Sequence, residues 1–203
     1  MRPAKPVHTA DWALRRLREG NQRFVRGKAR FPTVKKEFLA ELAKGQRPYA
    51  TIIGCSDSRV PPELVFDARF GELFIVRVAG NVISREIMGT IQYAALHLGT
   101  PLFVVLGHEG CGAVEAALAR KFDGVRQRRR ITVLLNAILP GLRGLRARQR
   151  PAARLKAAVE ANVRWSMRQL QRTPEAKQRR KEGVLKLVGA VYELNTGRVR
   201  FLS

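Results

Sequence analysis

Residues 49–59 read Tyr-Ala-Thr-Ile-Ile-Gly-Cys-Ser-Asp-Ser-Arg, and residues 102–112 read Leu-Phe-Val-Val-Leu-Gly-His-Glu-Gly-Cys-Gly. Each stretch begins as an apolar run rich in β-branched residues and ends in a polar, glycine-containing loop. Such runs are typical of strands that are buried on both faces of a sheet. Ligands of open α/β sheets sit at the carboxyl ends of the strands, so we expect the two loops to face one site.

The segments around these two stretches alternate between strand and helix patterns. A third apolar run, Leu73–Val78, is followed by a helix pattern over Arg85–Leu98. Ser84 is placed to cap this helix, and Gly99 is placed to end it. A strand, a crossover helix and a parallel strand form a βαβ unit. The sequence therefore predicts the α/β class, with a mainly parallel central sheet flanked by helices.

Cys55, His108 and Cys111 are the candidate metal ligands. If the two loops converge, these residues offer two thiolates and one imidazole, and three such ligands with a fourth position suit Zn²⁺. Asp57 can occupy the fourth position, which closes the site, or leave it to water. Zinc lowers the pKa of a water that it binds toward ~7, which produces a hydroxide nucleophile at neutral pH.

Arg59 is placed to pair with Asp57 through a two-point contact. If Arg59 holds Asp57 away from the metal, Asp57 can accept a hydrogen bond from the zinc-bound hydroxide and orient it. If Asp57 binds the metal instead, the site is inactive. Low pH is expected to favour this closed state, because Asp57 displaces water more easily than hydroxide.

Arg77 interrupts the apolar run of residues 73–78. A buried arginine is rare unless it is paired. We expect either an ion pair with an acid such as Asp67 or Glu72, or a contact with an anion or a neighbouring subunit.

Lysine and arginine are in large excess, with 39 basic against 16 acidic residues and a formal net charge of +23. The basic residues crowd the region 120–150 and, again, Lys177–Lys181. Aromatic residues are almost absent from both clusters, which argues against a platform that stacks single-stranded bases. We interpret the excess as a solvated, Arg-rich helical surface, with a polyanion site as the alternative. No specific nucleic-acid partner is predicted.

Location and redox state follow from composition. No apolar run reaches the roughly 18 residues of a membrane span. The basic residues at the start of the chain are followed by no apolar stretch of the kind that secretory signals contain. We therefore expect a cytoplasmic protein without a membrane partner. The chain has two cysteines, and in the cytoplasm their polar settings favour metal ligation or catalysis over a disulfide.

Taken together, the motifs resemble those of the β-class carbonic anhydrases. The resemblance rests on residues 55–60 (Cys-Ser-Asp-Ser-Arg-Val), 77–81 (Arg-Val-Ala-Gly-Asn), 107–112 and 191–197. In order and spacing it covers about residues 10–122 and the final hairpin. It implies a carbonate dehydratase, an enzyme that hydrates carbon dioxide reversibly to bicarbonate and a proton. It also implies that the three candidate ligands bind zinc and that Asp57 and Arg59 form the catalytic dyad.

A substrate pocket and an assembly are also implied by the resemblance. Gln46 would hydrogen-bond the substrate, and Phe74 with Tyr93 would line an apolar slot for carbon dioxide, with Tyr93 coming from the neighbouring subunit. Family members are dimers or assemblies of dimers, including tetramers, in which the N-terminal arm embraces the partner. Some members have an inhibitory bicarbonate site with a tryptophan where this chain has Ile52, so we expect the constitutively open form.

The length of 203 residues suits a single domain, which we divide into four segments. The segments are a helical arm (1–45), a zinc-site core (46–122), an Arg-rich helical segment (123–182) and a C-terminal strand hairpin (183–203). The arm contains an amphipathic helix pattern over residues 10–27, capped by Thr9, that can lie on its own domain or on a partner. The hairpin is indicated by Asn195-Thr196-Gly197 between two apolar runs.

Two alternative functions remain open. A hydrolase of carbon disulfide or carbonyl sulfide on the same scaffold would have the same zinc site and would differ in pocket access or assembly. A binding protein with a structural zinc and a basic surface would keep Asp57 permanently on the metal.

Overall fold

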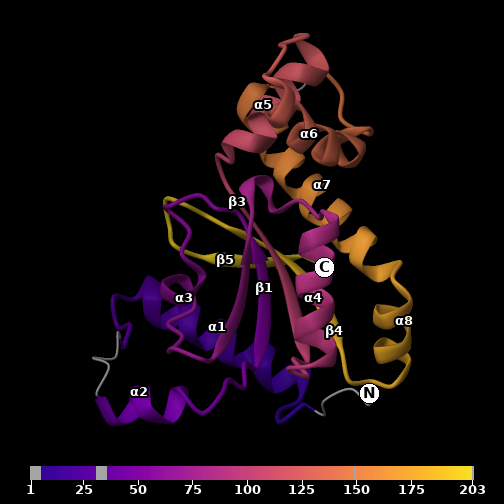
Figure 1. Cartoon of the computed structure of the whole chain (residues 1–203). Helices are drawn as coiled ribbons and strands as arrows, with labels where there is room; N and C mark the ends of the chain where they lie inside the picture. The colour runs from indigo at the N-terminus through magenta and orange to yellow at the C-terminus, as the bar shows by residue number, and fades with distance from the viewer. Residues whose placement is uncertain (1–5, 31–35, 149, 203) are drawn as a thin grey trace.

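The computed structural model describes residues 6–30, 36–148 and 150–202. Arg2 and Lys5, the basic residues at the start of the chain, lie outside these ranges. Within the described residues the sheet consists of β1 (Ala50–Gly54), β2 (Leu73–Arg77), β3 (Leu102–His108), β4 (Lys186–Tyr192) and β5 (Val199–Leu202). Their order is β2-β1-β3-β4-β5 (Figure 1). β1 to β4 are parallel and β5 is antiparallel to β4, which confirms the mainly parallel sheet and the hairpin.

Helix α1 (Ala10–Val25) covers one face of the sheet (Figure 1). Its residues Ala13, Leu14 and Leu17 are buried in a cluster with side chains of β1 and β3. The predicted cap is confirmed, because Thr9 Oγ1 accepts a hydrogen bond from the backbone N–H of Trp12 at 3.2 Å. Of the two locations that the sequence left open, α1 therefore occupies the one on its own chain.

The other face of the sheet is covered by helices from later in the chain. The further described helices are α2 (Lys36–Leu42), α3 (Pro62–Val65), α4 (Arg85–Leu96), α5 (Gly112–Phe122), α6 (Arg129–Ile138), α7 (Pro151–Gln171), α8 (Pro174–Lys181) and the 3-10 turns η1 (Ala79–Asn81) and η2 (Leu139–Leu142). Ile91 of α4 and Val163 of α7 share a core with Ile53 and Val105 of the sheet. Ser84 caps α4 as predicted, with its Oγ accepting from the Ile87 N–H at 3.3 Å.

Close packing of α7 on the sheet depends on Gly107. A Cβ atom at this position would lie 2.6 Å from Cγ2 of Val163, so a side chain here would force α7 away from β3. The absence of a side chain at Gly107 thus serves helix packing rather than the approach of a ligand.

Beyond the carboxyl end of the sheet, α5, α6 and η2 form the apex of the molecule (Figure 1). Of these elements, α6 and η2 belong to the predicted Arg-rich segment, whereas α5 lies in the predicted zinc-site core; residues 123–182 contain the helices α6, α7 and α8. Among the described helices, none is both long enough and apolar enough to cross a membrane.

Candidate metal centre

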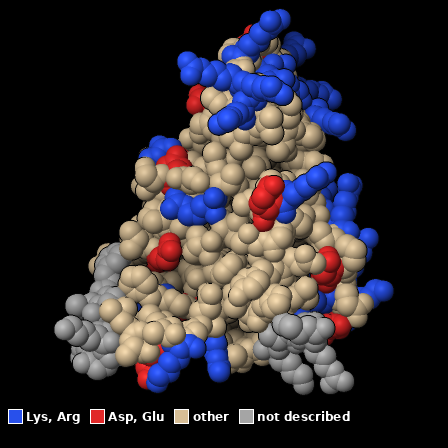
Figure 2. Space-filling model, in the orientation of Figure 1, with Lys and Arg blue, Asp and Glu red and all other residues tan. Residues whose placement is uncertain are grey.

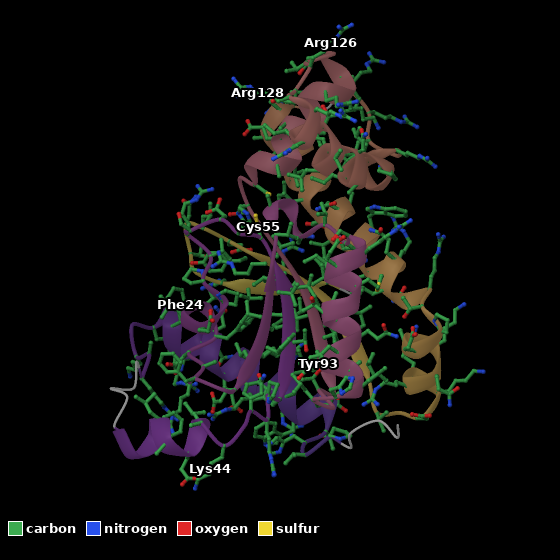
Figure 3. All side chains as sticks on the ribbon, in the orientation of Figure 1. Phe24, Lys44, Cys55, Tyr93, Arg126 and Arg128 are labelled. Carbon is green, nitrogen blue, oxygen red and sulfur yellow. The ribbon has the colours of Figure 1, made fainter. Side chains whose placement is uncertain are left out.

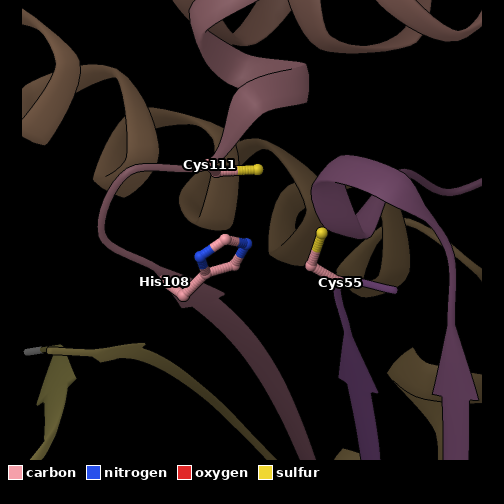
Figure 4. A group of neighbouring side chains, drawn as sticks. All are labelled: Cys55, His108 and Cys111. Carbon is pink, nitrogen blue, oxygen red and sulfur yellow. The ribbon is translucent and has the colours of Figure 1, made fainter. Parts of the chain in front are cut away.

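Three potential metal ligands meet at the carboxyl edge of the sheet (Figure 4). Cys55 directly follows β1, His108 ends β3, and Cys111 precedes the first residue of α5. β1 and β3 are parallel neighbours, so their carboxyl ends lie side by side. One ligand atom from each of the three residues lies within 4.8 Å of the others, and all three side chains are buried. The predicted convergence of the two loops is confirmed.

The imidazole of His108 is oriented with one nitrogen toward the cysteines. Its Nδ1 lies 2.9 Å from the carbonyl oxygen of Glu109. A carbonyl can only accept, so Nδ1 carries the hydrogen and Nε2 keeps its lone pair. Among the described residues Nε2 has no hydrogen-bond partner, although it is buried. A buried nitrogen without a partner beside two sulfur atoms fits a metal ligand, and the Nδ1 contact is the outer-shell bond that such ligands make.

The two cysteines are free, and their pKa values shift in opposite directions. A hydrogen bond from the Cys111 thiol lowers the pKa of Cys55 to about 4, and the Gly80 N–H, 3.3 Å from the Cys55 sulfur, contributes to the shift. Donation to Cys55, together with burial, raises the pKa of Cys111. The hydrogen bond between the two cysteines favours the thiolate at Cys55, and a bound cation would favour the thiolate at Cys111 as well. Two sulfurs and one imidazole are a donor set that suits zinc.

Asp57 and Arg59 form the predicted two-point pair next to this cluster. Arg59 Nε donates to Oδ1 of Asp57 at 2.9 Å, and Arg59 Nη2 donates to Oδ2 at 2.7 Å. The backbone N–H of Arg59 also donates to Oδ1 at 3.0 Å. The Arg59 guanidinium holds the pKa of Asp57 well below its usual range. Asp57 Oδ2 lies 3.8 Å from Nε2 of His108, so the carboxylate borders the cluster while Arg59 occupies both of its oxygens.

Arg77 fixes the loop that carries Cys55. Its Nε donates to the carbonyl oxygen of Cys55 at 2.8 Å, and its Nη2 donates to that of Asp57 at 2.6 Å. One guanidinium therefore spans the residue that offers a sulfur and the residue that offers a carboxylate. The planar fork of arginine suits this task, because it binds two acceptors in a fixed geometry.

The expected ion pair of Arg77 with Asp67 or Glu72 is wrong. Asp67 pairs with Arg23 at 2.5 Å, and Glu72 pairs with Arg16 at 3.2 Å. Strand register is the reason. Arg77 lies opposite the last residue of β1, at the carboxyl end of the sheet, whereas both acids precede β2.

The turn that donates to Cys55 is held by α7, and the sequence did not reveal this support. Gly80 has φ of +69°, and a Cβ there would lie 2.8 Å from Cδ1 of Ile138. Asn162 Nδ2 donates to the carbonyl of Gly80 at 2.7 Å, and Ser166 Oγ donates to that of Asn81 at 2.9 Å. The available signal was a pair of polar residues, Asn162 and Ser166, four positions apart within an otherwise apolar helix stripe.

Gln46, Phe74 and Tyr93 are not brought to the candidate metal ligands of their own chain. Phe74 pairs with Thr51, four residues before Cys55, which corresponds to roughly 13 Å along the strand. The Tyr93 ring is 6.3 Å from the Phe74 ring and 47% exposed. Gln46 and Phe74 line a surface hollow of about 530 Å³. Figure 3 shows Tyr93 well separated from Cys55, toward the amino end of the sheet.

Comparison with known proteins places this geometry in a family. The family model described as carbonic anhydrase matches residues 50–199. Carbonic anhydrase 2 of Mycobacterium tuberculosis is 39% identical over 187 residues, which span 92% of this chain and 89% of that protein. The carbonic anhydrase of Mycolicibacterium smegmatis is 37% identical and spans 94% of this chain and 92% of that protein.

Solved structures agree with the sequence comparison. A β-carbonic anhydrase of Aspergillus fumigatus, CafA, superposes with a TM-score of 0.75 at 25% identity and covers 95% of this chain and 90% of that chain. The mainly parallel sheet and the helices on its two faces are therefore shared with structures of this class. The chain belongs to the β-carbonic anhydrase family.

Proposed function

We propose that this protein is a carbonate dehydratase that hydrates carbon dioxide reversibly to bicarbonate and a proton, with zinc as its metal. The observation that carries the proposal is the buried Cys55, His108 and Cys111 cluster, in a chain of the β-carbonic anhydrase family. These three residues would hold the ion through two sulfurs and Nε2 of His108. Zinc at this position would supply Lewis acidity, which makes water a nucleophile at neutral pH.

Asp57 and Arg59 have distinct parts in this proposal. Arg59 engages both carboxylate oxygens of Asp57, which keeps Asp57 ionised and away from the fourth ligand position. Asp57 borders the cluster through Oδ2, so it can accept a hydrogen bond from the reacting water and set its orientation. Arg59 is thus a positioning residue, and the arrangement supports the open form of the site.

The substrate pocket is proposed to form between two chains. Carbon dioxide has no dipole, so an apolar slot that matches its shape suits it better than polar contacts do. Phe74 and Tyr93 offer such a slot and Gln46 a hydrogen bond, but they lie far from the ligands of their own chain. A homodimer, or an oligomer built from dimers, would supply them to the partner's metal centre. The β-carbonic anhydrases of Sordaria macrospora, with a TM-score of 0.74 at 25% identity over 95% of this chain and 96% of that chain, are tetrameric.

Stopped-flow measurement of carbon dioxide hydration between about pH 6.5 and pH 9, with metal analysis of the same sample, tests the proposal. We expect one zinc ion per chain and a rate that rises with pH, because deprotonated water is the nucleophile. Full zinc content without hydration at any pH would contradict it. Turnover of carbonyl sulfide or carbon disulfide in that case would identify the hydrolase alternative.

Arg59→Ala separates the enzyme from a protein with a structural zinc. We expect the variant to retain zinc and to lose hydration by about 10- to 100-fold, because Asp57 is no longer held in place. Arg172→Ala removes an exposed arginine at the end of α7 and serves as the matched control, with unchanged turnover. If Arg59→Ala hydrates carbon dioxide as fast as the parent, the assigned role of Arg59 is wrong.

A further inference from the structure

The apex of the molecule carries a dense positive surface, which we call the basic tip (Figure 2). It consists of the exposed residues Arg126, Arg128, Arg129, Arg130, Arg143, Arg146, Arg148 and Arg150. Asp123 is the one acidic residue between positions 116 and 159 of the sequence. Within the described part of the chain, no ion pair involves an arginine of the basic tip. The charge therefore faces solvent without internal compensation.

The start of α6 concentrates this charge. Arg128 is the N-cap residue, Arg129 and Arg130 open the helix, and the first turn contains no acidic residue. A helix N-terminus already carries partial positive charge, so three arginines there repel the helix dipole and one another. A nearby hollow of about 390 Å³ is lined by residues that include Arg120, Arg126 and Thr132. Anionic groups bound at this surface would relieve the repulsion.

Apolar side chains stand among these arginines. Val125 is 41% exposed, Ile131 is 42% exposed and Val133 is 67% exposed. The aromatic residue of this region, Phe122, is half-buried, and its ring is covered by Lys121 and Arg154 at 5.1 and 5.0 Å. Nucleic-acid bases stack on exposed aromatic rings, which this surface lacks. A short helix with arginines and exposed aliphatic residues is instead typical of peripheral contact with a lipid bilayer.

The location of the basic tip keeps it available. Arg126 and Arg128 lie beyond Cys55 at one end of the molecule, whereas Tyr93 lies toward the other end (Figure 3). A partner chain that brings its Tyr93 to the Cys55 loop need not cover Arg126 and Arg128, because these residues lie beyond that loop. Contact between two basic tips in a two-fold dimer would place arginines against arginines, which is strongly unfavourable. The partner of this surface must therefore be anionic.

We infer that the basic tip docks the protein onto an anionic membrane surface. The arginines contact lipid phosphates, and Val133, which shares a face of α6 with Arg129 and Arg130, enters the boundary between headgroups and acyl chains. The contact is peripheral and requires no spanning helix. This inference assigns a membrane partner to a surface that we interpreted from the sequence as solvated. It does not depend on the proposed enzyme activity.

Flotation with lipid vesicles at about 0.15 M salt tests this inference. We expect binding to vesicles that contain phosphatidylserine and none to pure phosphatidylcholine. The triple variant Arg128→Gln, Arg129→Gln, Arg130→Gln should bind about 100-fold more weakly, since each cation near an anionic surface contributes roughly a factor of five. The matched control, Lys177→Gln, Arg180→Gln, Lys181→Gln, removes equal charge from exposed positions on α8 and should stay within a few-fold of the parent. Equal losses in the two variants would overturn a local docking surface.

Val133→Ser distinguishes a bilayer from another polyanion, because it changes no charge. We expect vesicle binding to weaken roughly three- to tenfold, as apolar area is lost from the interface. Unchanged vesicle binding, with displacement of the protein from vesicles by duplex DNA or RNA, would assign the basic tip to nucleic acid and overturn the inference. Unchanged circular dichroism and carbon dioxide hydration in every variant show that the fold is intact.

Discussion

The two ends of the sheet differ in how complete they are within one chain. At the carboxyl end, Cys55, His108 and Cys111 are buried, and hydrogen bonds fix the groups around them. At the amino end, Tyr93 stacks on His97 but stays half-exposed, and the hollow beside Phe74 is open. Three groups that could hold a metal meet at the carboxyl end within one chain, whereas the residues that we propose to recognise the substrate lie at the amino end, away from that cluster. Under the proposed function, assembly of two chains would bring the chemistry and the substrate recognition together.

The apolar surface around the amino end supports this division. Leu64 and Phe70 are exposed and line the same hollow as Phe74. Exposed apolar side chains that gather around one hollow are typical of an interaction site. A second copy of the chain would bury this surface and place its own carboxyl end against it.

The largest effect is expected from Cys111→Ser, which removes a candidate metal ligand at the carboxyl end of the sheet and leaves the amino end unchanged. A serine hydroxyl is a poor substitute for a thiolate ligand, so metal content should fall below about one-tenth and hydration below about one-thousandth of the parent values. Metal analysis and stopped-flow assays measure both quantities. Size-exclusion chromatography provides the control, because the oligomeric state should be unchanged. Normal turnover with Ser at this position would remove Cys111 from the ligand set.

A mixed dimer tests whether the two ends act across subunits. We expect Tyr93→Ala to lower hydration by roughly tenfold, because the apolar slot loses one wall. Co-expression of the Cys111→Ser chain with the Tyr93→Ala chain, purified through two different affinity tags, creates one site with intact ligands and one intact tyrosine. That mixed dimer should recover about half of the parent activity.

The opposite result has a clear meaning. If Tyr93 served the metal centre of its own chain, the mixed dimer would contain no intact site. Its activity would then be about half that of the Tyr93→Ala dimer, or roughly one-twentieth of the parent activity. Such an outcome would show that each chain closes its own pocket by a rearrangement absent from this structure.

The features that could be predicted from the sequence depend on patterns of residues close together in the chain. The β-branched runs before Cys55 and His108 specify parallel strands, and parallel neighbours bring their carboxyl loops together. Asp57 and Arg59 are two residues apart, so their pairing is a short-range contact. The strands, the ligand cluster and this pair therefore followed from spacing along the chain.

Long-range contacts explain what the sequence could not predict. Asn162 reaches the carbonyl of Gly80 across 82 positions, and no local pattern links the two. Arg77 had acidic neighbours in the sequence, but register placed it beside backbone carbonyls instead. A sequence does not indicate which backbone carbonyl accepts a hydrogen bond from a side chain, because every residue has a carbonyl. The support around the candidate metal centre is thus the part that needed a structure.

Arg77→Met removes that support and leaves the candidate metal ligands intact, so its expected effect is among the smaller ones. Cys55 and Asp57 each lose a donor to the carbonyl oxygen, so their loop should hold the metal less firmly. Outer contacts of this kind are worth about 10- to 100-fold in metal affinity, and we expect the lower value because the side chains that bind are unchanged. Competition with a chromogenic chelator measures the affinity.

Two further substitutions decide whether the geometry of Arg77 or its charge matters. Arg77→Lys keeps the charge but cannot span both carbonyl oxygens, so its metal affinity should lie between those of the parent and Arg77→Met. Arg16→Met breaks the partly exposed pair with Glu72 and should leave metal affinity unchanged. If Arg77→Lys matches the parent, charge alone supports the loop. If Arg16→Met lowers the metal affinity as much as Arg77→Met does, both substitutions act through the overall stability of the protein. The hydrogen bonds at the carboxyl end of the sheet would then not account for the metal affinity on their own.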